Sequence, residues 1–344
     1  MMPSRKLAWC CAVLAVTISS AGRAAGQQPQ QPPFNPTSPN VHDPVMAKEG
    51  DTYYVFGTGR GIPTLHSQDL VTWEQGPPVF AEVPEWTKQA LPGFNGDIWA
   101  PDIIYYQGRY HLFYACNALP GKPHAAIGHA SSPTLDPKSR NYKWTDHGKI
   151  VQSIMGRDTW QAIDPNAVLD EGGHPWLAFG SFWDGIKLVR LKDDMMGLTW
   201  PEEWHSLARR PSAQRPYEYS LRDSQIEAAF IFKRGPYYYL FVSFDLCCRG
   251  VNGDYKIAVG RSTELTGPYF DRQGVDMLDG GGTIVAQGDG ARWAAVGHNG
   301  VYRIDGKDYL VTHAYSIPEK GASKLVVKEL TWDRDGWPVV DLLK

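Results

Sequence analysis

Four carboxylic acids and one histidine recur at matching places along the 344-residue chain. Each stands just before an extended apolar stretch that leads into a glycine-containing turn: Asp43, Asp102, Asp164, Glu227 and His298. Neighbouring like charges raise one another's pKa, so a ring of carboxylates is costly unless it binds something or shares protons. A strand-end Asp taken alone more often caps a turn. The recurrence of the whole set favours a functional site, because a structural ring would carry Val or Ile.

Convergent carboxylates indicate glycoside hydrolysis. In that reaction a carboxylic acid protonates the departing oxygen, while a carboxylate activates water or attacks the sugar carbon. A third carboxylate can keep the acid protonated at working pH. The chain also has 13 Trp and 17 Tyr, whose rings can stack on sugars. It contains no G-x-S-x-G elbow, P-loop or HExxH motif, so other hydrolytic chemistries have no comparable support.

The elements that must position these residues form a repeat. The leading residues lie about sixty residues apart, and each segment has the pattern of a hairpin, as in DIIYYQGRYHLFYA from Asp102. That spacing leaves room for two further strands, which makes a four-stranded blade. We therefore predict an all-β, five-bladed β-propeller with its active site at the central channel. The alternative is five unrelated hairpins in a β-sandwich, a fold that lacks such a repeat.

The N-terminus is typical of a secretory signal, because a charged start precedes a short apolar run and then small residues. We expect a signal peptide over residues 1–26, a Pro/Gln-rich linker over 27–40 and a propeller catalytic domain over 41–344. A retained membrane anchor is the alternative, although the apolar run is short for a bilayer. We expect a secreted monomer, extracellular or periplasmic, that is free of the membrane after signal removal. A formal net charge of −3 without a basic block argues against nucleic-acid partners.

Beyond the predicted signal the cysteines are Cys116, Cys247 and Cys248, an odd number that does not suit a disulfide framework. Adjacent cysteines can pair only through a strained eight-membered ring. We therefore expect Cys247 and Cys248 to be two buried thiols, with a vicinal disulfide as the alternative.

Several motifs resemble glycoside hydrolase family 43. They are VHDP (41–44), WAPD (99–102), AIDPN (162–166), GSFWDGIKL (180–188) and SQIEA (224–228). Three more are similar to the arabinanase branch of that family: SFDLCCRGVNGDYKIAVGRS (243–262), GGGT (280–283) and VGHN (296–299). The likeness runs from about Val41 to the C-terminus. It implies a five-bladed propeller that acts on arabinan and arabino-oligosaccharides.

The resemblance also implies catalytic roles. Asp43 would be the general base that activates water, Glu227 the general acid, and Asp164 the group that raises the pKa of the acid and orients it. The family inverts anomeric configuration, which fits an acid and a base far enough apart to hold a water between them. His298 resembles a channel histidine that helps to hold calcium, largely through water; sodium or water alone is the alternative.

Substrate contacts follow from the same likeness. The residues implied are Asp43, Trp99, Gln161, Ala162, Ile163, Asp164, Asn166, Ser181, Phe182 and Trp183. Trp99 and Trp183 could stack on furanose rings, although packing inside a blade is the alternative for each. Asp102 has no chemical step and is interpreted as structural support or as part of an ion shell. Ala229 departs from the family pattern, which commonly has Pro after IEA.

The expected function is cleavage of internal α-1,5-L-arabinofuranosidic bonds with inversion. Exo-action by an arabinanase or arabinofuranosidase of the same family is one alternative, since the loops that open or block a groove cannot be read from sequence. A non-catalytic sugar-binding propeller is another. The presence of Asp43, Asp164 and Glu227 together argues against it, because a lectin needs no base, acid and modulator.

Overall fold

The structure is a computed structural model that describes residues 34–210 and 224–343. The chain divides into Met1–Phe34 and a compact unit, Asn35–Lys344. The predicted signal peptide and the first half of the predicted linker lie outside the described residues, so both remain predictions. In the described part, no helix is long and apolar enough to cross a membrane.

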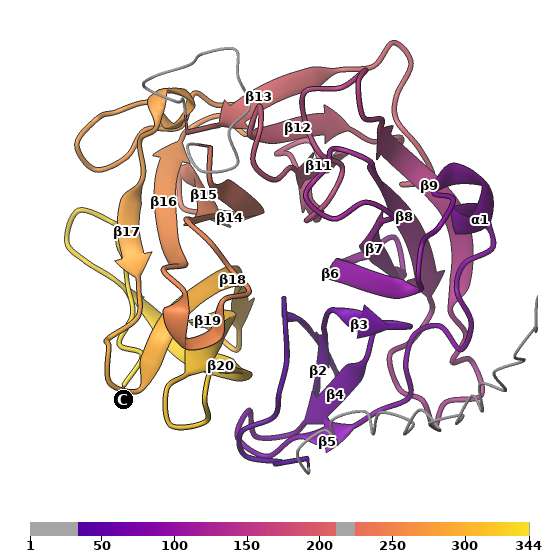
Figure 1. Cartoon of the computed structure of the whole chain (residues 1–344), viewed down its shortest axis with the longest axis horizontal. Coiled ribbons are helices and arrows are strands. Elements are labelled where there is room, and N and C mark those ends of the chain that lie inside the picture. Colours follow the sequence, from indigo (N-terminus) through magenta and orange to yellow (C-terminus); the bar gives the residue numbers. More distant parts are fainter. Residues whose placement is uncertain (1–33, 211–223, 344) are drawn as a thin grey trace, which may run out of the picture. The chain divides into compact units, whose positions relative to one another are not determined.

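Five antiparallel sheets surround a common centre (Figure 1). The first is β1 (Val45–Glu49), β2 (Thr52–Phe56), β4 (Thr64–Ser67) and β5 (Glu74–Gln75); the second is β3 (Gly59–Arg60), β6 (Asp97–Tyr106), β7 (Arg109–Asn117), β8 (Ala125–Ser132) and β9 (Thr145–Ser153). The third is β10 (Asn166–Leu169), β11 (Pro175–Phe179), β12 (Ile186–Arg190) and β13 (Trp204–Ala208). The fourth is β14 (Ile226–Arg234), β15 (Tyr237–Phe244), β16 (Lys256–Ser262) and β17 (Thr283–Ala286); the fifth is β18 (Trp293–Ile304), β19 (Lys307–Ser316), β20 (Ala322–Trp332) and β21 (Pro338–Val339).

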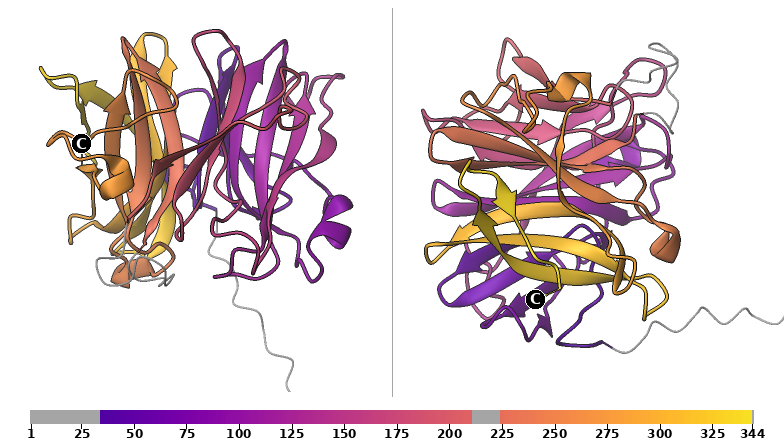
Figure 2. Two further views of the ribbon diagram at one scale, coloured as in Figure 1. Left: turned by 90° about the horizontal axis from the view of Figure 1, so that it is seen from above. Right: turned by 90° about the vertical axis from the view of Figure 1, so that its left-hand side faces the viewer.

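This arrangement confirms the predicted all-β, five-bladed propeller. Its strands run between two opposite faces of the molecule (Figure 2). The described helical elements are short: α1 (Trp86–Ala90), η1 (Gly250–Asn252) and η2 (Met277–Asp279). Blade 2 differs from the predicted four strands, because the short strand β3, which lies between β2 and β4 of blade 1 in sequence, pairs with β6.

The predicted ring needs a correction. Five residues with positive φ mark equivalent places at the channel ends of the blades: Asp43, Ala100, Asp164, Ala228 and His298. Asp102 and Glu227 are therefore not in register with the other three predicted members. Asp102 stands two residues after Ala100, and Glu227 stands one residue before Ala228. The inner hairpins of blades 2, 4 and 5 all carry a register shift at this place, as between Trp99 and Asp102 in blade 2. Such bulges redirect side chains near functional sites, and sequence spacing alone does not reveal them.

Polar side chains connect neighbouring blades near the channel. Asp102 Oδ2 accepts hydrogen bonds from the Ala167 backbone, at 2.7 Å, and from Asn166 Nδ2, at 3.3 Å. Asn166 Oδ1 in turn accepts from the backbone N–H of Ile231, at 2.9 Å. Burial raises the pKa of Asp102 to about 7. The structural interpretation of Asp102 is confirmed, since its carboxyl fastens blade 2 to blade 3.

The N-terminal end of the propeller is joined to blade 5. The Val41 backbone donates to Ser323 O at 3.1 Å, and Asn40 forms a β-bridge with Lys324. Trp73 N also donates to Pro36 O. Residues from Asn35 onward thus lie against the blades, so the compact unit begins slightly before the predicted start at Val41. Backbone pairing, which the Pro/Gln composition does not indicate, is the reason.

Candidate active site

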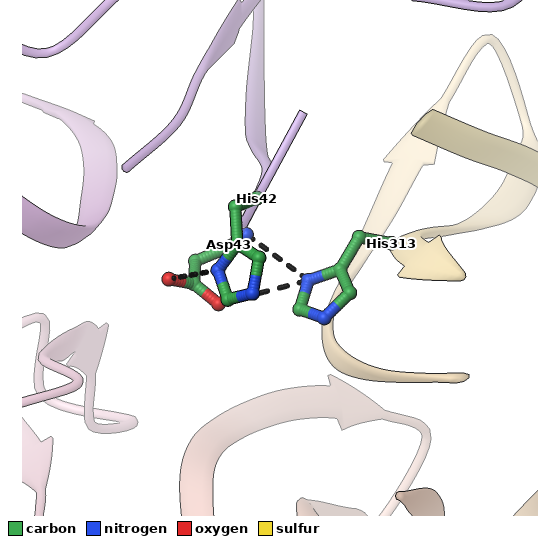
Figure 3. A group of neighbouring side chains, drawn as sticks. All are labelled: His42, Asp43 and His313. Carbon is green, nitrogen blue, oxygen red and sulfur yellow. Dashed lines mark hydrogen bonds and ion pairs between the residues drawn. The ribbon is translucent and has the colours of Figure 1, made fainter. Parts of the chain in front are cut away.

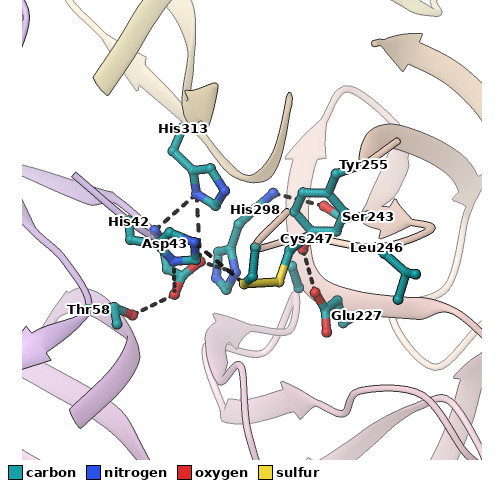
Figure 4. Close-up of a disulfide and its surroundings, with 12 residues drawn as sticks. His42, Asp43, Thr58, Glu227, Ser243, Leu246, Cys247, Tyr255, His298 and His313 are labelled. Atoms are coloured by element: carbon teal, nitrogen blue, oxygen red, sulfur yellow. Dashed lines mark hydrogen bonds and ion pairs between the residues drawn. A yellow bond between two sulfur atoms is a disulfide. The ribbon is translucent and has the colours of Figure 1, made fainter. Parts of the chain in front are cut away.

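The Asp43 side chain is surrounded by hydrogen-bond donors at the start of β1. Its Oδ2 lies 2.8 Å from His42 Nδ1 and accepts from the Thr58 hydroxyl, while its Oδ1 lies 3.0 Å from His298 Nδ1 (Figure 4). Burial opposes ionisation, but the positive charges of His42 and His298 hold the pKa of Asp43 well below its usual range. Asp43 is therefore an ionised carboxylate that can accept a proton.

His313 fixes the backbone of Asp43. Its Nδ1 accepts from the Asp43 backbone N–H at 3.1 Å, and its ring stacks on His42 with 4.2 Å between centroids (Figure 3). The ring is fully buried, and burial holds the pKa of His313 well below its usual range. A neutral His313 with a free lone pair on Nδ1 matches this contact. It supports the left-handed conformation of Asp43, which a residue with a side chain adopts only at a cost.

Glu227, at the start of β14, has partners of a different kind. Its Oε1 accepts from the Tyr255 hydroxyl and its Oε2 from the Ser181 hydroxyl, both at 2.8 Å. Burial, aided by the negative charge of Asp43, raises the pKa of Glu227 despite these bonds. The side chain is thus biased toward the protonated form that a general acid needs.

Asp164 lies beside Glu227. Its Oδ2 accepts from the backbone N–H of Ala228 at 3.1 Å. Burial, together with the negative charges of Glu227 and Asp43, raises the pKa of Asp164, while the charge of His298 opposes the rise. Two buried carboxyls this close favour retention of a proton between them. The three predicted catalytic carboxyls are each between 6% and 8% exposed, so all lie in a poorly hydrated channel.

His298 lies among these groups. Burial opposes its protonation, but the negative charges of Asp43, Asp164 and Glu227 raise the pKa of His298 to about 9. Its backbone N–H donates to Ser243 Oγ at 2.8 Å. The imidazole is therefore cationic near neutral pH.

Three of the predicted substrate-contacting side chains are aromatic and partly exposed. Trp99 packs with one edge on the small cluster of Ala115, Ala125 and Ile163. The Phe182 and Trp183 rings lie nearly edge to face, with centroids 6.3 Å apart. Partly exposed rings are available to a furanose face.

The other predicted substrate contacts are engaged within the protein. Gln161 Nε2 donates to Lys122 O at 3.0 Å, and the Ala162 backbone donates to Ser153 Oγ at 3.0 Å. Asn166 connects blades and Ser181 bonds to Glu227, as described above. Sugar contacts by these residues therefore remain predictions, and Ser181 acquires a direct contact with the expected acid.

Sequence reasoning missed several members of the site: Thr58, Ser243, Tyr255, His313 and Tyr315. Three of them lie on the second strand of an inner hairpin: Ser243 on β15, and His313 and Tyr315 on β19. Ser243 pairs with Glu227, and His313 pairs with Gly297. A polar residue near the end of an apolar second strand was the available signal. It recurs in the stretches YYYLFVS and DYLVTH.

One grouping in the described chain has side-chain atoms close enough together for a single metal ion: His42, Asp43 and His313. These atoms already contact one another, because His42 Nδ1 lies on the Asp43 carboxylate and His313 Nδ1 accepts from the Asp43 backbone (Figure 3). We interpret the group as support for Asp43 rather than as a metal centre.

The expectation of two thiols at Cys247 and Cys248 is wrong. The two residues form a disulfide with each other, and Cys116 is the free, buried cysteine of the described chain. The expectation assumed burial, whereas the loop after β15 leaves Cys248 exposed and Cys247 only partly covered.

A propeller channel that holds one ionised carboxylate close to buried carboxyls with raised pKa values has the equipment of an acid–base glycoside hydrolase. Comparison with known proteins agrees with that class. Residues 34–338 match the Glycosyl hydrolases family 43, and the chain belongs to this family.

Among its relatives, the extracellular exo-α-(1→5)-L-arabinofuranosidase of Cellvibrio japonicus is 45% identical over 302 residues, which cover 88% of this chain and 86% of that protein. The extracellular endo-α-(1→5)-L-arabinanase 1 of Bacillus subtilis is 40% identical over 302 residues, with 87% of each chain covered. The structure of the Cellvibrio cellulosa α-L-arabinanase with arabinohexaose superposes with a TM-score of 0.85 at 44% identity, covering 88% of this chain and 96% of that one.

Proposed function

We propose that this protein hydrolyses α-1,5-linked L-arabinan, with Asp43 as the general base and Glu227 as the general acid. The supporting observation is the contrast between their partners. Asp43 is held between the imidazoles of His42 and His298, whereas Glu227 accepts from two neutral hydroxyls. Environments that push the pKa values of two carboxyls apart assign the base and the acid.

In this mechanism Asp43 takes a proton from water as the water attacks the anomeric carbon. Glu227 gives its proton to the glycosidic oxygen as the bond to the leaving sugar breaks. Asp164, through the Ala228 N–H contact and its own charge, keeps Glu227 protonated and oriented. Asp43 then loses its proton to solvent and Glu227 regains one, which restores the starting state.

The substrate class is supported by relatives that cover most of the chain. The Cellvibrio japonicus and Bacillus subtilis relatives are both named for action on α-(1→5)-L-linked arabinose polymers, and the Cellvibrio cellulosa structure contains arabinohexaose. We propose arabinan and arabino-oligosaccharides as the substrates here. Trp99, Phe182 and Trp183 are the proposed stacking surfaces because their rings remain partly exposed.

We further propose endo-action. We also propose inversion of the anomeric configuration, which direct attack by Asp43-activated water requires. Exo-action is a second candidate, because the Cellvibrio japonicus relative, at 45% identity, is named as an exo-acting enzyme. The two differ in how loops shape the ends of the groove.

Calcium beside His298 is a separate proposal. Asp43 contacts Nδ1 of His298, and the negative charges of three carboxyl groups act on this imidazole. Such a negative, oxygen-rich channel suits a hard cation. A calcium ion would balance the charge of the carboxyls, and His298 would hold it through water. Secretion by way of the signal over residues 1–26, and a monomeric state, are proposed on the sequence and on the extracellular names of two relatives.

Incubation with debranched arabinan tests the function. A rapid fall in viscosity with mixed oligomers is expected for endo-action, and arabinose or one short product from the start would indicate exo-action. Proton NMR of the first anomer should show the inverted β-configuration. Absence of any product would remove the enzymatic proposal, and net retention would remove Asp43 as a water-activating base.

A further inference from the structure

The Cys247–Cys248 disulfide lies in the loop between β15 and β16, close to the side chains that hold Asp43 (Figure 4). The Cys248 backbone N–H donates to Tyr315 Oη at 2.8 Å, and Tyr315 Oη lies 2.9 Å from His42 Nε2. Cys248 Sγ itself lies 3.7 Å from the same His42 nitrogen. Since His42 Nδ1 contacts the Asp43 carboxylate, a continuous chain of contacts leads from the disulfide to the proposed base.

Cys247, the other half of the disulfide, lies against a cluster that includes a partner of Glu227. Cys247 packs against a small apolar cluster formed by Tyr255, Ala295 and Tyr315. The hydroxyl of Tyr255 donates to Oε1 of Glu227 at 2.8 Å. Cys248 therefore contacts the supports of the proposed base, and Cys247 packs against a cluster that includes Tyr255, the support of the proposed acid.

The local backbone needs a constraint of this kind. Cys248 has a φ of 65°, in the left-handed region that residues with a side chain rarely adopt. A ring closed between adjacent residues limits the rotation of the peptide that joins them. Before the disulfide, Asp245 is held at 2.6 Å by both Arg210 and Lys256, and the Leu246 N–H donates to Asp254. These contacts fix the loop directly after the end of β15.

We propose that the Cys247–Cys248 disulfide is a positioning element for Asp43 and Glu227, acting through Tyr315 and His42 on one side and through Tyr255 on the other. The proposal rests on the base and acid roles given above. Small displacements of catalytic groups are costly: a shift of about 1 Å can lower turnover by about 100-fold. Release of the loop should therefore reduce kcat more than it weakens substrate binding.

Two variants and two substrates test this inference. Tyr315→Phe keeps the ring and removes the hydroxyl that joins Cys248 to His42; Cys247→Ser/Cys248→Ser removes the covalent ring. Each is assayed on an unmodified arabino-oligosaccharide and on one with a dinitrophenolate leaving group, which needs little acid assistance. For Tyr315→Phe we expect kcat to fall about tenfold on both substrates with KM within about twofold, because only the base is displaced.

The substrate with the activated leaving group distinguishes an effect on the acid from an effect on the base. Tyr255→Phe should lose activity on the unmodified sugar and recover much of it on the activated one, because its contact is with the acid. The double cysteine variant should recover only in part, because it releases both sides. Its effect should not add fully to that of Tyr315→Phe, since the two changes interrupt one path.

Chemical reduction tests the same point without a mutation. Dithiothreitol supplies two electrons and two protons to the disulfide, which becomes two thiols, while the reagent closes to its own cyclic disulfide. We expect kcat to fall about tenfold and to return on reoxidation, with reduction verified by thiol mass labelling. Cys116→Ala is the matched control, because it removes the other described cysteine and should leave both changes intact.

Unchanged kcat in verified reduced enzyme and in Tyr315→Phe would overturn the proposal, even if the double variant failed to fold. A loss confined to thermal stability, or one seen only in KM, would do so as well, since it would indicate a purely structural loop. Failure of the proposed function looks different: the untreated enzyme would be inactive, or Asp43→Asn would keep its activity.

Discussion

Three stacked histidines in blade 2 should make the protein unstable in acid. His111 Nδ1 lies 3.0 Å from His129 Nε2, and the His129 and His147 rings stack with centroids 4.9 Å apart. Burial lowers the pKa of His129 to about 2 and that of His111 to about 4. The charges of neighbouring groups also disfavour protonation: Arg109 and His147 act on His111, and His111 and His147 act on His129.

The direction in which stability changes with pH follows from proton uptake. The unfolded chain, with histidine pKa values near 6.5, binds protons before the folded protein does, so stability is lost as the pH falls below about 6.5. A histidine whose pKa drops from 6.5 to about 2 on folding costs about 3 kcal/mol of stability at pH 4. His111 adds a similar amount, so the pair removes roughly 6 kcal/mol, comparable to the whole stability of many domains.

Urea unfolding at pH 7 and pH 4 measures this loss. His129→Gln keeps an amide near the position of the ring nitrogen but cannot be protonated, so it should lose about 3 kcal/mol less than the parent protein between the two pH values. The exposed His174→Gln is the control and should behave like the parent. Equal pH dependence in His129→Gln and the parent would refute the reasoning, whatever the absolute stability of the variant.

Four further outcomes concern the site. Asp43→Asn and Glu227→Gln should each lower kcat by about 1,000-fold, and only Glu227→Gln should regain activity on a dinitrophenyl substrate; rescue of Asp43→Asn would contradict the roles. Asp164→Asn should move the alkaline limb of the kcat/KM profile to lower pH, because it removes the buried carboxyl that favours retention of a proton between itself and Glu227; an unmoved limb would exclude this role. Gly297→Ala would place a methyl group 2.1 Å from the Tyr255 ring, so unfolding should cost about 1–3 kcal/mol less, and unchanged denaturation would contradict this packing. Chelation should lower activity and Tm with recovery on added calcium; full activity after metal removal, verified by elemental analysis, would reject the ion.

The blade count could be predicted because the repeat is local. Each inner hairpin joins strands separated by a short turn, and residues such as Gly108 and Gly235 adopt the positive φ that the turns require. In the third hairpin Gly173 adopts that conformation. Strand β3 could not be foreseen, because its pairing with β6 depends on contacts between blades.

The site could be predicted only as far as the repeated positions reach. Asp43, Asp164 and Glu227 were found because they stand at the starts of inner strands. Tyr255 directly precedes β16 and Tyr315 lies on β19, so neither stands at a repeated position, and the two meet in one apolar cluster that joins blades 4 and 5. The disulfide was misjudged because adjacency in sequence does not reveal exposure.

The pKa values of the base and the acid differ because their partners differ in charge, not because the two side chains differ in burial. Asp43 and Glu227 are equally buried, and both accept hydrogen bonds on their two oxygens. A cationic donor stabilises a carboxylate more than a neutral hydroxyl does. His42 and His298 therefore keep Asp43 ionised, whereas Ser181 and Tyr255 orient Glu227 without offsetting the effect of burial. The raised pKa of His298 follows from the same pairing, so the charges of base and histidine sustain each other in a channel that would otherwise discourage both.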